Sequence, residues 1–123
     1  MHLDHEPGAA PADEIGFDEF LKVDIRVGTI VDAEVYEGAR KPSLKLRIDF
    51  GPGIGVRRSV GQVRALYAPE DLVGRQVAAV VNFPPRQIGK ALSEALTLGF
   101  ADDEGRVVLF SPDSRVPDGA RLF

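Results

Sequence analysis

Residues 43–50 read SLKLRIDF and form the clearest alternating stretch of the sequence. Leu44, Leu46, Ile48 and Phe50 occupy every second position, with charged residues between them. Because successive side chains of a strand point to opposite faces, this pattern predicts a strand with one buried face and one solvated face. The GPGIG stretch that follows predicts a turn.

Further strands are predicted on both sides of this one. Residues 24–36 alternate and are rich in β-branched side chains, and the glycine inside this run, Gly28, is typical of a bulge or a sharp bend. Other strand patterns cover residues 56–60, 75–83, 94–100 and 106–110, and the last two are joined as a hairpin across an Asp-Asp-Glu-Gly turn.

Two short helices are predicted as well. Residues 17–21 carry apolar side chains at helical spacing, with Asp18 as the N-cap, and should pack on the domain. Residues 63–67 have a similar pattern, which Pro69 ends. Since strands and helices do not alternate, we predict an all-β fold, a five-stranded Greek-key barrel of the OB-fold type; a small SH3-like barrel would have a similar sequence.

Charge is distributed unevenly along the 123 residues. The net charge is −4, yet residues 1–19 contain six acidic residues and no Lys or Arg, whereas residues 40–90 contain ten basic and three acidic residues. Residues 1–14 are rich in Ala, Pro and acidic residues, a composition that buries too little apolar surface to offset the entropy of ordering. We therefore expect an acidic flexible tail over residues 1–16 and one folded domain over residues 17–123.

The composition also restricts the available chemistry. There is no Cys, and the two histidines, His2 and His5, lie in the predicted tail without a third strong ligand nearby. The predicted domain thus lacks a thiolate nucleophile and a histidine acid or base, and we expect no catalytic residue, no metal, no cofactor and no enzyme activity. The longest apolar run, Val77 to Val81, is much shorter than the roughly 20 residues that span a membrane. No leader pattern begins the sequence, so a cytoplasmic location is expected.

Basic residues around the predicted second to fourth strands indicate a ligand-binding surface. OB folds bind nucleic acid across strands two and three and the flanking loops, with basic groups and an aromatic stacking platform. Arg57 and Ser59 should share the ligand-facing side of the third strand. Phe83 is either a platform or a core residue, and the apolar strand before it favours the core. The candidate residues are Lys45, Arg47, Arg57, Ser59, Arg64, Asn82, Phe83, Arg86 and Lys90. A normal solvated β-surface would carry similar charges.

Longer passages of the sequence resemble a known family. Residues 20–30 (FLKVDIRVGTI), 45–51 (KLRIDFG) and 67–77 (YAPEDLVGRQV) resemble passages of the tRNA-binding OB-fold domain family, and Ser93-Glu94 matches a Ser-Glu pair of its fifth strand. The resemblance covers almost the whole predicted domain. This family occurs as appended domains of methionyl- and phenylalanyl-tRNA synthetases and as free-standing dimeric tRNA-binding proteins.

Two passages resemble one subgroup of this family, the CsaA-type export-related chaperones. Residues 82–89 (NFPPRQIG) are similar to a passage of that subgroup, and Ala95-Leu96 departs from the Gly-Met of the tRNA binders in the same manner. The resemblance implies a homodimer of OB folds. It implies two kinds of partner: unfolded preproteins together with the secretion ATPase, as in the subgroup, and tRNA, as in the wider family.

The same resemblance assigns residues to a ligand groove. Asn82, Arg86, Ser93 and Glu94 match positions expected in the groove of the subgroup, and Ser93 and Glu94 complete the candidate set for peptide or RNA. For Ser93 and Glu94, a hydrogen bond that closes the barrel is the alternative role.

Overall fold

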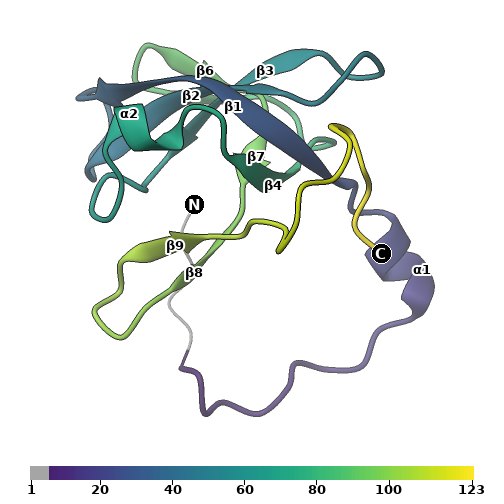
Figure 1. The fold of residues 1–123 in the computed structure, drawn as a ribbon. Coiled ribbons are helices and arrows are strands. Elements are labelled where there is room, and N and C mark those ends of the chain that lie inside the picture. Colours follow the sequence, from purple (N-terminus) through teal and green to yellow (C-terminus); the bar gives the residue numbers. More distant parts are fainter. Residues whose placement is uncertain (1–5) are drawn as a thin grey trace.

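The computed structural model describes residues 6–123, and most of its regular elements are strands (Figure 1). In chain order they are α1 (Phe17–Leu21), β1 (Ile25–Tyr36), β2 (Ser43–Asp49), β3 (Val56–Gly61), α2 (Pro69–Leu72), β4 (Gln76–Val80), β5 (Arg86–Ile88), β6 (Ala91–Ser93), β7 (Leu96–Thr97), β8 (Gly99–Ala101) and β9 (Val107–Leu109). His2 and His5 lie outside the described residues. Residues 6–16 are exposed and contain no helix or strand. No helix within residues 6–123 is long and apolar enough to cross a membrane.

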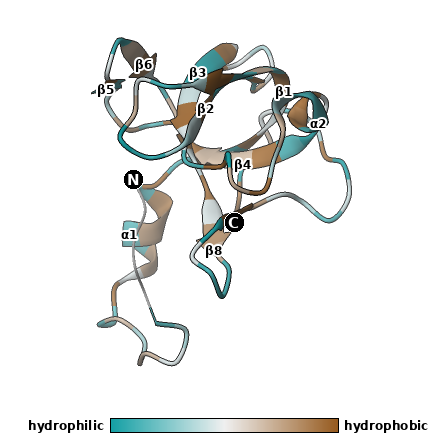
Figure 2. Cartoon of the chain, turned by 90° about the vertical axis from the view of Figure 1, so that its left-hand side faces the viewer, coloured by the Kyte–Doolittle hydropathy of each residue, from teal (hydrophilic) through white to brown (hydrophobic). Residues whose placement is uncertain are grey.

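Five strands form one antiparallel sheet in the order β3-β2-β1-β4-β7. The long strand β1 lies at its centre: Ile25 to Thr29 pair with β4, and Thr29 to Tyr36 pair with β2. The sheet curls into a half-barrel, visible in Figure 2 as strands β1 to β4 bending around a common centre. The predicted all-β fold of the OB type is therefore confirmed.

A β-bulge interrupts the pairing of β1 with β2. The register of β1 against β2 shifts at Val31, three residues after the glycine where we expected the irregularity. Gly28 instead serves a close approach of backbones. A Cβ atom at this position would lie 2.6 Å from Cγ2 of Ile48 and 2.7 Å from Cδ1 of Phe50. Both contacts are shorter than van der Waals separation, so the packing at this point requires glycine.

The core lies inside the curl of the sheet. Leu44, Leu46, Ile48 and Phe50 are all at most 1% exposed, which confirms the inward face predicted for the opening stretch. Strand β4 is buried along its whole length, because it lies between β1 and β7 and under the chain that follows β9. Leu72 of α2 closes one end of this core.

Both predicted helices differ from the structure in detail. The N-cap of α1 is Gly16, Asp18 makes no cap hydrogen bond, and α1 buries none of its residues. The helix predicted over residues 63–67 is wrong, since the chain turns there and α2 begins at Pro69. Proline suits the first position of a helix, because its fixed φ is helical and the N–H that it lacks would have no partner within the helix. Pro69 therefore begins a helix here rather than ending one.

The last third of the chain contains more short strands than the pattern predicted. The stretch predicted as one strand over residues 94–100 is divided at Leu98: β7 pairs with β4, and β8 pairs with β9. Leu98 joins the two sheets, because its N–H donates to Ala78 O and its carbonyl accepts from Phe110 N. The β5–β6 hairpin was not predicted, because its three-residue strands are too short to show an alternation.

Candidate ligand-binding surface

The β5–β6 hairpin stands against β3 and separates two hollows of the surface. The first hollow, of about 280 Å³, lies over the outer face of β2 and β3, and we call it the basic hollow. Its charged residues are Asp32, Glu34, Lys45, Arg47, Arg58 and Lys90. The second hollow, of about 400 Å³, lies between the hairpin and β7, and we call it the apolar groove. Its lining residues are Val60, Phe83, Pro84, Arg86, Ile88, Ser93, Glu94, Ala95 and Leu96.

The strand register decides which basic residues reach the basic hollow. In the β2–β3 ladder Arg47 lies opposite Arg58, and Lys45 lies opposite Val60. Directly opposed residues of an antiparallel ladder point to the same face, so Arg58 joins Lys45 and Arg47 on the outer side. The sequence prediction missed Arg58. The register, set by the turn between β2 and β3, was the signal that would have found it.

Ser59 and Arg57 lie on the inner side of β3, opposite the side of Arg58, and a contact of either residue with ligand stays a prediction. Ser59 is 1% exposed. Its hydroxyl donates to Ala95 O at 2.8 Å and shares a second hydrogen bond with the Thr97 hydroxyl at 2.7 Å. The Arg57 guanidinium donates to Val81 O at 2.7 Å. These bonds tie β3 to the segment around β7 and to the end of β4, and thereby hold the curl of the sheet.

Charges in the basic hollow are partly compensated. Lys45 forms an ion pair of 2.8 Å with Glu34 and lies 5.7 Å from the centre of the Tyr36 ring. The hydrogen bond and the negative charge of Glu34 raise the pKa of Lys45 above its ordinary value, so the ammonium stays protonated. In contrast, Arg47 and Lys90 form no ion pair with any residue between 6 and 123. Their charges remain available to a ligand.

Ser93 and Glu94 attach the hairpin to β3. The Glu94 carboxylate accepts from Arg58 N at 3.0 Å and from Arg58 Nε at 2.9 Å, and the Glu94 N–H donates to Arg58 O. The Ser93 hydroxyl accepts from Val60 N at 3.1 Å. The sequence left two roles open for Ser93 and Glu94, ligand contact and a hydrogen bond that closes the barrel. The structure contains the hydrogen bonds of the second role. Both residues also line the apolar groove, so a contact with ligand stays a prediction.

The hydrogen bonds from Arg58 make Glu94 sensitive to acid. They lower the pKa of Glu94 below its ordinary value of 4.5, with the Arg58 side chain as the largest cause. A carboxyl group whose pKa is lower in the folded state stabilises the fold above its unfolded pKa and loses this contribution as the pH falls through the folded pKa. We expect Glu94→Gln to cost about 1 kcal/mol at pH 7 and less at pH 3, below the ordinary pKa of 4.5. Thermal unfolding at both pH values measures this, with Glu37→Gln, a mostly exposed carboxylate, as the control.

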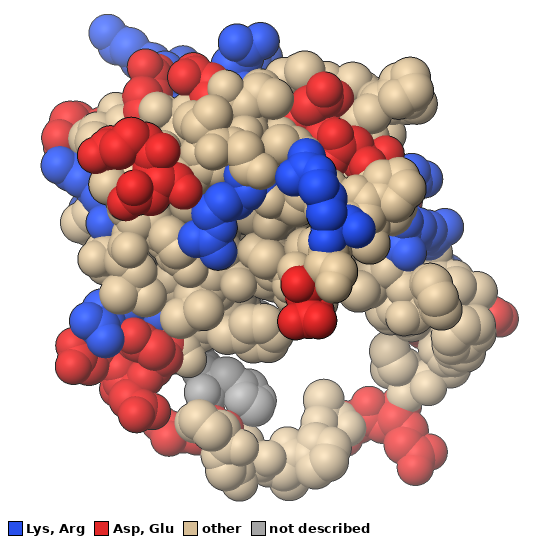
Figure 3. Space-filling view, viewed as in Figure 1, with Lys and Arg blue, Asp and Glu red and all other residues tan. Residues whose placement is uncertain are grey.

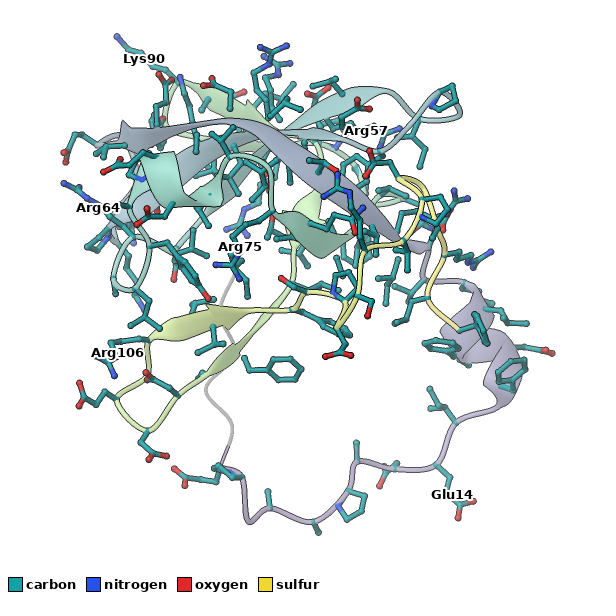
Figure 4. All side chains as sticks on the ribbon, viewed as in Figure 1. Glu14, Arg57, Arg64, Arg75, Lys90 and Arg106 are labelled. Atoms are coloured by element: carbon teal, nitrogen blue, oxygen red, sulfur yellow. The ribbon has the colours of Figure 1, made fainter. Side chains whose placement is uncertain are left out.

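Two further candidates have structural partners of their own. Asn82 Oδ1 accepts from Asp24 N at 2.9 Å, and its Nδ2 donates to Lys22 O at 2.8 Å, which ties the end of α1 to the end of β4. Arg64 pairs with Glu37 at 3.2 Å and lines neither hollow. In Figure 4 Lys90 lies at the upper left of the molecule, in the turn between β5 and β6, and Arg57 lies right of centre, well away from it. The structure thus brings together only part of the predicted set.

Phe83 lies in the apolar groove and is 50% exposed, so the core position that the apolar strand favoured is wrong. Strand β4 ends at Val80, and therefore its alternation no longer determines the direction of a side chain three residues later. Pro84, Ile88 and Leu96 surround Phe83 with further apolar surface, and Arg86 brings a positive charge to the same groove. Gathered partly exposed apolar side chains of this kind are typical of a surface that binds a partner.

Within residues 6–123 no three His, Cys, Asp or Glu residues lie close enough together to hold an ion. What the site offers is a basic hollow and an apolar groove side by side on a small OB fold, which defines a binding module of the OB class.

Comparison with known proteins agrees with this class. Residues 25–121 match the family described as "Putative tRNA binding domain". The chain is 41% identical over 115 residues to the methionine–tRNA ligase of Porphyromonas gingivalis, a match that covers 93% of this chain and 16% of the ligase. It superposes on the crystal structure of the chaperone CsaA from Bacillus anthracis with a TM-score of 0.85 and 41% identity, covering 90% of this chain and all of that one. For CsaA from Picrophilus torridus the TM-score is 0.83, the identity 40%, and the coverage 89% and 100%.

The chain belongs to the tRNA-binding domain family and, within it, to the CsaA type. It spans about one sixth of the length of the methionine–tRNA ligases that it matches, and the part it shares with them is the tRNA-binding domain.

Proposed function

We propose that this protein is a non-catalytic chaperone of the cytoplasm that binds unfolded preproteins during export, as a homodimer, and passes them to the secretion ATPase. The apolar groove is the observation that supports this proposal best. Its half-exposed Phe83 lies beside Pro84, Ile88 and Leu96. Unfolded polypeptides expose the apolar side chains that folded proteins bury, so they can contact such a surface. The titles of the two similar CsaA structures describe those proteins as chaperones.

An extended polypeptide fits the shape and chemistry of the apolar groove. The groove runs between the β5–β6 hairpin and the short edge strand β7, so a segment lying in it has backbone and apolar side chains within reach. Arg86 gives the groove a donor for peptide carbonyl groups or acidic side chains. We therefore assign peptide binding to Phe83, Arg86, Ile88 and Leu96.

Replacing Phe83 with Ala should weaken peptide binding about tenfold, because truncating a partly buried aromatic anchor removes roughly 1 to 2 kcal/mol of contact. Fluorescence anisotropy with a labelled, permanently unfolded polypeptide measures the affinity. Phe100→Ala is the matched control, since Phe100 is also exposed but lies on β8, outside the groove. Equal losses in the two variants would contradict the assignment.

Binding of tRNA through the basic hollow is the second candidate function, supported by Lys45, Arg47, Arg58 and Lys90 around one depression. Phosphate contacts release counterions, so tRNA binding must weaken steeply with salt, whereas peptide binding in an apolar groove must weaken little. Titrating labelled tRNA and the unfolded polypeptide at low and high salt separates the two functions. Absence of tRNA binding even at low salt would eliminate the second. A synthetase partner, the remaining alternative, requires co-purification with a synthetase.

The proposed dimer contact is the exposed apolar surface at α1 and the C-terminal residues. Phe17 and Leu21 are 70% and 45% exposed, and Phe123 is fully exposed. The two segments lie side by side, because Arg121 Nη2 donates to Leu21 O (Figure 1). Neighbouring exposed apolar side chains of this kind mark a surface that binds a partner.

Light scattering should therefore give about twice the 13.3 kDa of one chain. The variant Phe17→Ser should shift the protein toward one chain per particle, since it removes the most protruding aromatic residue of α1. Val73→Ser, an exposed apolar residue outside α1 and the C-terminal segment, is the control. A wild-type mass of one chain would contradict the dimer.

We also propose that residues 1–16 form a tail outside a binding domain that covers residues 17–123. Glu14 lies far from Lys90 in Figure 4, at the opposite end of the molecule. In Figure 3 acidic side chains lie along the lower part of the molecule and also on the upper part of its body.

A further inference from the structure

The tip of the β5–β6 hairpin is held by one hydroxyl group. Tyr36, the last residue of β1, donates to Ile88 O at 2.6 Å and accepts from Lys90 N at 3.0 Å and from Ala91 N at 3.2 Å. A tyrosine hydroxyl has one proton to donate and accepts at its oxygen, so these three bonds use its hydrogen-bonding capacity in full. All three partners belong to the turn of a single hairpin.

Two glycines allow this hydroxyl to enter the turn. Gly89 has a φ of +59°, and a Cβ atom there would lie 2.5 Å from the Tyr36 hydroxyl oxygen and 2.6 Å from Gly38 O. A Cβ atom at Gly38 would overlap the same hydroxyl. The loop after β1 and the hairpin turn therefore approach each other around Tyr36 as closely as backbone atoms permit.

Without this contact the hairpin has little to hold its tip. Only three residue pairs join β5 to β6, and none of the six strand residues is buried. Two-stranded hairpins of this size are at best marginally stable by themselves. The base of the hairpin is attached to β3 through Ser93 and Glu94, which leaves the Tyr36 hydroxyl as the attachment of the tip.

We propose that Tyr36 is a positioning residue for ligand binding: its hydroxyl fixes the β5–β6 hairpin and thereby sets the geometry of the basic hollow and the apolar groove on its two sides. The hairpin carries Lys90 into the basic hollow and Arg86 and Ile88 into the apolar groove. This inference rests on the proposed binding of tRNA and peptide. It adds that one group governs both, although it lines neither hollow itself.

The test is Tyr36→Phe, which removes the hydroxyl and retains the ring beneath Lys45. Tyr67→Phe is the matched control: the protein has two tyrosines, and the Tyr67 hydroxyl also accepts a backbone bond, from Leu109 N at 3.1 Å, far along the chain from the hairpin. Amide exchange of Lys90 and Ala91 should be about tenfold faster in Tyr36→Phe and unchanged in Tyr67→Phe. Binding of labelled tRNA at low salt and of the unfolded polypeptide should each weaken severalfold in Tyr36→Phe alone.

A second variant checks that both effects come from the same contact. Gly89→Ala places a methyl group against the hydroxyl and should speed exchange of the same amides. In the double variant the effect should be smaller than the two single effects added together, because both substitutions act through one contact. Normal exchange in Tyr36→Phe overturns the proposal, and so does fast exchange with unchanged binding. If the wild-type protein binds neither tRNA nor the unfolded polypeptide, the proposed function fails. This outcome is distinguishable from the two outcomes that overturn the role of Tyr36, because it is seen without any substitution.

Discussion

The double variant Arg47→Glu, Lys90→Glu should lose tRNA binding by well over tenfold at low salt. These are the two basic residues of the basic hollow that form no ion pair within residues 6–123, so their charges are free to neutralise phosphates. Lys45 and Arg58 are already paired with Glu34 and Glu94. Each lost phosphate contact should reduce the slope of log affinity against log salt by about 1, so the slope should fall by about 2.

Total charge is the alternative explanation, and a matched variant excludes it. Lys22→Glu with Arg106→Glu changes the net charge by the same amount, but these residues lie on α1's end and on the turn beside β9, outside the hollow. Filter binding of labelled tRNA over a series of salt concentrations gives both affinity and slope. Equal losses in the two double variants would mean that tRNA responds to overall charge and that the basic hollow is not its site.

Gly28→Ala should destabilise the protein strongly, because the added methyl group has no room in the core. Its Cβ atom would meet Ile48 Cγ2, Phe50 Cδ1 and the Asp49 carbonyl oxygen, the last at 2.9 Å. Ile48 and Phe50 are at most 1% exposed and cannot move without displacing the core. Overpacking of this kind costs about 3 kcal/mol, which lowers Tm by roughly 10 °C in a domain of this size.

The control for this substitution is Gly53→Ala. Gly53 lies in the turn between β2 and β3, where an added Cβ atom meets nothing within 4 Å. Differential scanning calorimetry of both variants measures the difference. A Gly28→Ala protein that melts within 2 to 3 °C of the wild type, as single surface substitutions do, would show that β1 and β2 can separate at low cost.

Local alternation was enough to predict most of the sheet. Leu44, Leu46, Ile48 and Phe50 take up the core because a strand repeats every two residues and one face must be buried. Alternation could not predict the shortest strands. The three-residue strands β5 and β6 are too short to show a period, although they form the wall between the two hollows. Pro69 was predicted to end a helix but begins α2. Proline occurs at both ends of helices, and its position in the sequence alone does not distinguish them.

The candidate site depended more strongly on tertiary contacts. Arg57 and Arg58 are adjacent and chemically alike, and only the pairing of Arg58 with Arg47 shows which of them faces the basic hollow. Likewise, only the tertiary structure shows that Val60 N and Arg58 N donate to Ser93 and Glu94, while a contact of these two residues with ligand stays a prediction. Tyr36 gave no sign in the sequence, because its three partners lie more than fifty residues away.

By itself, the sequence determined the class of the protein: an all-β domain of the tRNA-binding OB type, whose basic residues are concentrated between positions 40 and 90. The all-β prediction follows from a two-residue repeat and the charge distribution from composition, both of which are local. The tRNA-binding type rests instead on the resemblance of residues 20–30, 45–51 and 67–77 to that family. The tertiary structure decided which side of β3 borders the basic hollow and how one hairpin divides this hollow from an apolar groove. Both depend on strand register and on hydrogen bonds between distant residues, and a one-residue change of register would turn every side chain of the strand to the other face.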